Sequence, residues 1–190
     1  SSENDLFLGL DIGSVNFRAA LVDGAGRVLG VDSERISKCA SASVRAVLER
    51  IQQRASFDRV AGAAVTGSGR RMYEGRAGWS VFSSPYAIIA GVLLDQPRAK
   101  TIISIGGQSS LVISLEDGLE KPWRVARSPL CAAGTGRFLE QQAARLGISI
   151  EEFGPKALEW TSPPPRIAAR CSVFAKSDLI HLQQKGWPVP

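Results

Sequence analysis

The chain has 190 residues, 44% hydrophobic and 22% charged, and its 23 Lys and Arg against 18 Asp and Glu give a net charge of +5. This composition is typical of a globular protein with one large domain or two small ones, and it excludes a disordered chain. The longest apolar run is too short for a membrane span, and no signal-peptide pattern is present. A single His argues against a His-rich zinc site, and three Cys argue against a disulfide scaffold. The basic residues do not cluster as they do in nucleic-acid-binding proteins.

Short apolar runs separated by turn residues predict the first elements in the chain. The run Leu-Phe-Leu-Gly-Leu-Asp-Ile ends at the turn Gly13-Ser14, and Asp23-Gly24-Ala25-Gly26 is a hairpin signal. After the third run, apolar residues recur at the spacing of one face of a helix. We expect strands at 6–12, 17–22 and 27–31, a helix at 43–55, a strand at 60–65 and a helix at 85–94.

The second part of the chain repeats this plan, with a glycine turn at Gly106-Gly107 and an Asp-Gly turn at Asp117-Gly118. We expect strands at 101–105, 111–115 and 122–126, and helices at 137–146 and 172–184. Two units of strand, glycine turn, strand, Asp-Gly turn, strand and helix predict an internal duplication. The predicted fold is α/β, with one half at 1–97 and a second half at 98–190.

The ends of the sequence suggest a larger protein. The chain begins Ser1-Ser2, its one Met is Met72, and it stops in Gly186-Trp187-Pro188-Val189-Pro190. We therefore expect a part of a longer protein, with the second half incomplete.

The two glycine turns are candidate phosphate-binding sites. Gly13 and Ser14 follow the first strand, and Gly106, Gly107 and Gln108 follow the strand at 101–105. Such turns let backbone N–H groups approach phosphate oxygens closely, and two of them across a cleft would clamp a nucleotide. The alternative is two ordinary hairpin turns, since neither a P-loop nor a complete dinucleotide-binding pattern is present.

Asp11 and a third glycine motif extend the nucleotide hypothesis. Asp11, at the end of the first strand, would hold a Mg²⁺-bound water and is the candidate catalytic residue. Gly134, Thr135 and Gly136 precede a predicted helix. They form either a third phosphate-facing turn or merely the start of that helix.

Two cysteines precede predicted helices. Cys131 and Cys171 each lie just before a helical run, where unpaired N–H groups and the helix dipole stabilise a thiolate. Two thiolates make half of the four that an iron–sulfur cluster normally takes, so a complete site would need two chains. The alternative is two buried cysteines that act as small hydrophobes. Cys39 has no partner signal and is expected to be structural.

Two blocks around the cysteines are the most specific in the sequence: Leu-Cys-Ala-Ala-Gly-Thr-Gly-Arg-Phe-Leu-Glu at 130–140 and Cys-Ser-Val-Phe-Ala-Lys-Ser-Asp-Leu-Ile at 171–180. They resemble blocks of one family, the activator ATPases of 2-hydroxyacyl-CoA dehydratases together with the ATPase subunits of benzoyl-CoA reductase (BadF/BadG/BcrA/BcrD type). Less specific blocks stand in the same order at 8–14, 65–70 and 105–108. The resemblance covers nearly the whole chain.

The resemblance implies a fold and an activity. The fold is that of acetate kinase, hexokinase, Hsp70 and actin, with two ribonuclease-H-like halves around a nucleotide cleft. The activity is hydrolysis of ATP with Mg²⁺ to pass a low-potential electron from ferredoxin or flavodoxin to a partner dehydratase or reductase. A homodimer would share one [4Fe–4S] cluster, held by Cys131 and Cys171 of each chain. A cytoplasmic, reducing and anaerobic setting is expected.

The sequence departs from the family pattern at the second phosphate turn. Ser104 and Ser109 replace two aspartates of the family, Leu111 replaces a lysine, and Lys176 stands where the family tends to have Glu. The family's adenosine-binding Gly-Gly segment would lie beyond residue 190. These departures keep open a degenerate, non-hydrolysing module of a larger activator. A small-molecule kinase of the same fold is a further alternative, although it leaves the cysteine blocks unexplained.

Overall fold

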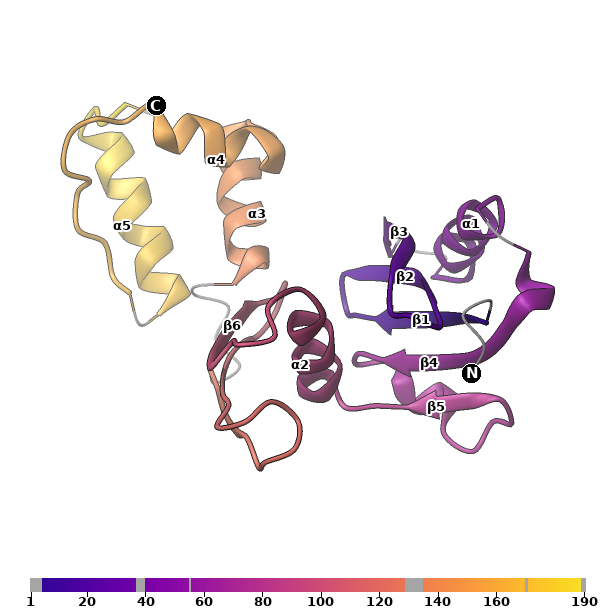
Figure 1. Ribbon diagram of the computed structural model, residues 1–190. Helices are drawn as coiled ribbons and strands as arrows, with labels where there is room; N and C mark the ends of the chain where they lie inside the picture. The colour runs from indigo at the N-terminus through magenta and orange to yellow at the C-terminus, as the bar shows by residue number, and fades with distance from the viewer. Residues whose placement is uncertain (1–4, 37–39, 55, 129–134, 170, 189–190) are drawn as a thin grey trace. The chain divides into compact units, whose positions relative to one another are not determined.

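The computed structural model describes residues 5–36, 40–54, 56–128, 135–169 and 171–188. The chain forms two compact units, the first made of Ser1–Ile102 and Leu115–Trp123, the second of Ile103–Ser114 and Arg124–Pro190. Figure 1 shows the elements in chain order from indigo to yellow. The predicted division into two ribonuclease-H-like halves, 1–97 and 98–190, stays a prediction. The same holds for the predicted incompleteness of the second half.

A five-stranded sheet forms the first unit, with strand order β3-β2-β1-β4-β5. Its strands are β1 (Leu6–Ile12), β2 (Asn16–Asp23), β3 (Val28–Arg35), β4 (Val60–Thr66) and β5 (Trp79–Val81). β1, β2 and β3 pair antiparallel, whereas β4 runs parallel to β1 and to β5. The register places Asp11 between Arg18 on β2 and Thr66 on β4.

The core of this unit lies on one face of the sheet. Alternate residues of β1 and β2 are buried there against Val47 and Ile51 of α1 (Ala40–Gln52). The strand members of this core are Leu6, Leu8, Leu10, Ile12, Phe17, Ala19 and Leu21. Because side chains alternate along a strand, Asp11 falls on the opposite face.

The hairpin between β2 and β3 is closed by a buried carboxylate. Asp23 accepts hydrogen bonds from the backbone N–H of Arg27 at 2.8 Å and of Ala25 at 3.0 Å. These bonds, with Arg27 foremost, hold the pKa of the Asp23 carboxyl below its usual value. Arg50 of α1 in turn hydrogen-bonds to Asp32 on β3 and lowers the pKa of that carboxyl.

A second sheet has the strand order β6-β7-β8. Its strands are β6 (Thr101–Ile105), β7 (Ser110–Ser114) and β8 (Arg124–Arg127). α2 (Ser84–Asp95) precedes β6 and is capped by the Ser83 hydroxyl, which accepts from the Tyr86 N–H. Leu111 and Ile113 of β7 are buried, whereas Ile103 and Ile105 of β6 are mostly exposed.

Three helices complete the second unit: α3 (Gly136–Leu146), α4 (Ile150–Leu158) and α5 (Ser172–Gln184). Gly147 ends α3 with φ +73°, a left-handed conformation that glycine adopts without strain. A capping box between Ser149 and Glu152 starts α4. The short 3₁₀ helices at Phe57–Arg59 and Arg70–Tyr73 belong to the first unit.

Most predicted elements are present. β1, β6 and α5 have the predicted bounds, but α1 begins and ends three residues before the range 43–55. β3 is longer than predicted, and β5 and α4 were not predicted. Within the described residues, the helices are all too short or too polar to cross a membrane.

Candidate functional site

The first glycine turn joins β1 to β2. The Gly13 N–H donates to the Asn16 carbonyl at 3.0 Å, and a Cβ on Gly13 would lie 2.8 Å from that oxygen. Real Cβ atoms do not approach so closely, so this position needs glycine. Ser14 is exposed, and its N–H donates to no group in the described part of the chain.

The second turn, between β6 and β7, closes in the same way. The Gly106 N–H donates to the Ser109 carbonyl at 2.8 Å, again three residues ahead. A Cβ on Gly106 would lie 3.1 Å from that oxygen, which is tight but less severe than at Gly13. The Gly107 N–H, like that of Ser14, has no acceptor among the described residues, and Gln108 is exposed.

The third glycine motif lies directly against the second turn. The N–H groups of Gly136 and Arg137 donate to the carbonyls of Gly106 (3.0 Å) and Gly107 (2.9 Å). The first two N–H groups of α3 are therefore engaged within the protein. The buried Thr135 is the residue before the helix. Gly106, Gly107, Thr135 and Gly136 come together, while Gly134 lies outside the described residues.

A loop after β4 braces the end of β1. Gly69 donates its N–H to the Ile12 carbonyl at 2.9 Å, and the Ser68 hydroxyl donates to the same oxygen at 3.3 Å. Gly67 has φ +90°, and a Cβ there would lie 2.4 Å from the Ile12 oxygen. No other residue type fits at position 67 without moving the strand.

The carboxylate of Asp11 is paired with a residue that the sequence analysis missed. The Arg18 guanidinium lies 3.1 Å from Asp11 Oδ2, directly opposite on β2, and both side chains are partly exposed. Strand alternation and the tight turn give the signal that would have found it: Asp11 and Arg18 are equidistant from the turn, on the same face.

Thr66 is a second missed residue, on the other side of Asp11. Its Oγ1 is buried and has no hydrogen-bond partner within the described chain. Asp11, Arg18 and Thr66 line part of a cavity of about 330 Å³ within the first unit. The small residues Gly9, Ala20 and Ala64 also line it, as does Ala87 of α2.

The second turn lacks the charge pair of the first. When the two turns are aligned on Gly13 and Gly106, Ser104 corresponds to Asp11 and Leu111 corresponds to Arg18. Ser104 is half-buried, and Leu111 is buried. Of these corresponding positions, only those at the first turn therefore carry the charged side chains that acid–base or metal chemistry needs.

Of the two cysteines predicted to hold a cluster, Cys171 can be placed. It is the residue before α5, in an extended conformation, half-buried, and its thiol caps no backbone group. A thiol at a helix N-terminus is a suitable metal ligand once deprotonated. Cys131 and Cys39 lie outside the described residues. The described residues contain no group of three or more His, Cys, Asp or Glu placed to bind a metal.

Comparisons with known proteins place the chain among the activators of 2-hydroxyacyl-CoA dehydratases by similarity. The profile of the BadF/BadG/BcrA/BcrD ATPase family matches residues 8–190. The chain is 31% identical to the 2-hydroxyisocaproyl-CoA dehydratase activator of Clostridioides difficile, across 94% of this chain and 66% of that protein. It is 28% identical to the (R)-2-hydroxyglutaryl-CoA dehydratase activating ATPase of Acidaminococcus fermentans, across 94% of this chain and 68% of that one.

A solved structure has the same fold. The activator of the 2-hydroxyisocaproyl-CoA dehydratase from Clostridium difficile, with bound ADPNP, superposes with a TM-score of 0.85 at 27% identity, covering 97% of this chain and 68% of that one. The α/β fold is therefore that of an actin-like ATPase, as predicted. The chain belongs to the BadF/BadG/BcrA/BcrD ATPase family.

Proposed function

We propose that the protein is an ATP-dependent activator that passes a low-potential electron to a 2-hydroxyacyl-CoA dehydratase or a related reductase. Two copies of the chain share one [4Fe–4S] cluster in this proposal, and ferredoxin or flavodoxin supplies the electron. The observation that carries it is the matched pair of glycine turns, each with one N–H left unpaired within the described chain.

The turns supply the nucleotide-binding groups. In each, the amide of Gly13 or Gly106 closes the turn, and the next amide, of Ser14 or Gly107, has no acceptor among the described residues. An unpaired N–H in a tight glycine turn is a favourable donor to a phosphate oxygen. The amides of Gly136 and Arg137 are engaged by the second turn, so the third motif supports that turn and donates nothing to phosphate through these two groups.

Asp11 is the catalytic residue of the proposal. Its carboxylate would hold Mg²⁺ or a Mg²⁺-bound water beside the phosphates. A bare carboxylate next to phosphate would be repelled, and the Arg18 guanidinium on Oδ2 offsets that repulsion. Arg18 therefore acts as a positioning residue. Ordinary exposed pairs of this kind contribute at most about 1 kcal/mol to stability, so the pair is suited to function more than to folding.

The cysteine ligands fit an iron–sulfur cluster in type and number. Cys171 presents a thiol that makes no capping bond at the start of α5, and Cys131 is the second ligand of the proposal. When bound, the cluster supplies one-electron transfer at low potential. Four thiolates require two chains, and Val173 and Phe174, next to Cys171, are apolar and about two-thirds exposed. A second copy would cover them.

Anaerobic reconstitution with iron and sulfide tests the proposal. We expect about four irons per dimer, lost in Cys131→Ala and in Cys171→Ala, with the variants sized by chromatography. The chain offers a matched control in its third cysteine, and Cys39→Ala should keep the iron. Equal iron in all three variants, or none in the unaltered protein, would contradict the cluster assignment.

A second function is favoured by the uncharged second turn. Ser104 and the buried Leu111 leave that turn without a carboxylate or a cation at these positions. The chain would then serve as a non-hydrolysing module of a larger activator. Nucleotide binding without phosphate release, alongside a normal iron content, would favour this function over the first.

A further inference from the structure

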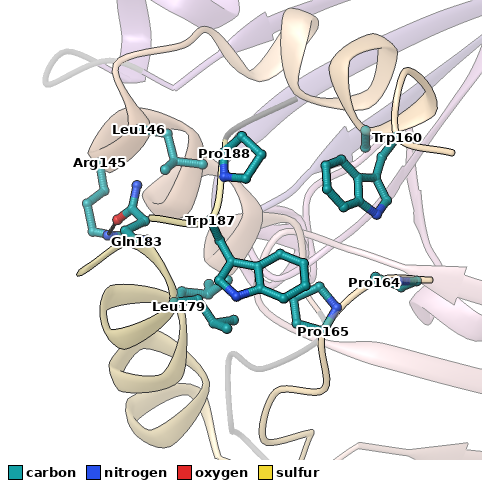
Figure 2. Close-up of a pocket in the computed structure, with 11 residues that line it drawn as sticks. Arg145, Leu146, Trp160, Pro164, Pro165, Leu179, Gln183, Trp187 and Pro188 are labelled. Carbon is teal, nitrogen blue, oxygen red and sulfur yellow. Dashed lines mark hydrogen bonds between the residues drawn. The ribbon is translucent and has the colours of Figure 1, made fainter. Parts of the chain in front are cut away.

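Two cavities of similar volume, one in each unit, differ in what lines them. In the second unit, a cavity of about 260 Å³ is lined mostly by apolar side chains, and by Arg145 and Gln183, which hydrogen-bond to each other (Figure 2). In the first unit, the ion pair of Asp11 and Arg18 lines the cavity of about 330 Å³. Of the two, the cavity of the first unit therefore has a carboxylate, and the contacts that hold this carboxylate in place can be traced.

The carboxylate of Asp11 is flanked on both of its oxygens. The Arg18 guanidinium lies 3.1 Å from Oδ2. On the side of Oδ1, the buried backbone of Gly67 comes so close that a Cβ there would lie 2.6 Å from the oxygen. Because two groups in such close contact cannot move independently, the place of Gly67 limits where the Asp11 carboxylate can lie.

Gly67 is held in turn by the side chain of Arg70. The Gly67 carbonyl accepts from Arg70 Nη1 at 3.1 Å, and from the Arg70 backbone N–H at 3.4 Å. These bonds close a turn in which Gly67 has φ +90°. Arg70 is only partly exposed, and a hydrogen bond from a charged group is stronger than a neutral one. The Arg70 side chain therefore fixes the conformation of this turn.

The same turn also holds the backbone that follows Asp11. The Gly69 N–H donates to the Ile12 carbonyl at 2.9 Å, and the Ser68 hydroxyl donates to it at 3.3 Å. A displaced turn would thus release the carboxylate of Asp11 and, at the same time, loosen the end of β1 beside it.

We propose that Arg70 is a positioning residue for Asp11. Its bond to the Gly67 carbonyl fixes the turn after β4, and this turn fixes the carboxylate that would hold Mg²⁺ beside the phosphates. The inference rests on the proposed function, in which Asp11 has that role. Arg70 acts through the turn and makes no contact of its own with the nucleotide.

Amide hydrogen exchange tests the turn without nucleotide. The Gly69 N–H is bonded to Ile12, so Arg70→Gln should raise its exchange rate by about tenfold or more. Arg71→Gln is the matched control, because it makes the same charge change at the exposed neighbouring residue, and the rate should stay within about twofold of the unaltered protein. Equal rates in the two variants would overturn the proposal.

Binding of ADPNP with and without Mg²⁺ then tests the action on Asp11. Arg70→Gln should weaken ADPNP by about tenfold or more with Mg²⁺, and should stay within about twofold in EDTA, because the phosphate-binding amides are unchanged. In an Asp11→Asn background, Arg70→Gln should add no further loss, since the two changes act through one group.

Two outcomes of the binding experiment separate this role from others. A loss that persists in EDTA or in the Asp11→Asn background would mean that Arg70 acts independently of Asp11, and would overturn the proposal while leaving the proposed function intact. If the unaltered protein bound no ADPNP, the proposed function itself would fail. The Gly69 exchange rates, measured without nucleotide, would still decide whether Arg70 holds the turn.

Discussion

At the first turn, the last carbonyl of β1 accepts from Gly69, in a loop that follows β4. At the second, the carbonyls of Gly106 and Gly107 accept from the start of α3. Both turns nevertheless close with the same i-to-i+3 bond. The closure is thus set by glycine and backbone geometry, whereas the support around each turn comes from a different part of the chain.

The charges differ more than the backbone does. The first turn has the Asp11–Arg18 pair, and the second has Ser104 and Leu111 at the corresponding positions. The backbone of each turn closes through its own glycine, Gly13 or Gly106, so the surrounding side chains can differ between the turns. In the proposed function, each turn offers a backbone donor to phosphate, and the charged groups lie at the first turn.

The largest expected effect on folding is at Gly67. Gly67→Ala combines a left-handed φ with a Cβ 2.4 Å from the Ile12 oxygen, and should cost about 3–5 kcal/mol of unfolding free energy. Gly91→Ala is the control, because Gly91 is an exposed residue inside α2 with open space around its Cβ position. That change should stabilise the protein by about 0.5–1 kcal/mol. Urea denaturation measures both, and equal values would contradict the close approach at Gly67.

A smaller effect separates the two turns. Gly13→Ala would place a Cβ 2.8 Å from a carbonyl oxygen and Gly106→Ala one at 3.1 Å. We expect a loss of about 2 kcal/mol for the first and about 1 kcal/mol or less for the second. Thermal unfolding of the two variants gives the comparison. If Gly106→Ala were the more damaging, the backbones of the two turns would differ in a way that their shared hydrogen bond does not explain.

The smallest expected effect is on the stability of the fold at acid pH. The pKa of Asp23 is lowered in the folded protein by hydrogen bonds from Arg27 and Ala25. A lowered folded-state pKa stabilises the protein above the unfolded value of about 3.9, and that stability is lost as the pH falls through the folded pKa. Asp23→Asn should therefore flatten the pH dependence of unfolding below about pH 4. An unaltered pH dependence in Asp23→Asn would contradict this account.

The sequence prediction missed one strand, β5, and one helix, α4, for different reasons. β1 and β6 are short apolar runs that stop at glycine, and their length and the glycine favour a strand over a helix. The helix α4 was missed because Gly154 and Pro155 argue against a helix, although Ser149 and Glu152 give the capping-box signal that starts it. β5 has three residues and no periodicity to detect.

The candidate site was predicted in part. The glycine turns and Asp11 follow from residue type and position. Arg18 could have been found from the hairpin register, which puts it opposite Asp11. Thr66 could not, because the pairing of β4 with β1 joins residues more than fifty positions apart. The engagement of the Gly136 amide by the second turn is likewise a long-range contact. Local sequence patterns carry no information about such contacts.

The most direct test of the different roles proposed for the two turns compares variants at the corresponding positions Asp11 and Ser104. ATP hydrolysis is measured for Asp11→Asn and for Ser104→Ala, with binding of a non-hydrolysable nucleotide as the second readout. We predict that Asp11→Asn loses hydrolysis by about 100-fold or more, while Ser104→Ala stays within about twofold. Equal losses in both variants, or full activity in Asp11→Asn, would contradict the assignment of the chemistry to the first turn.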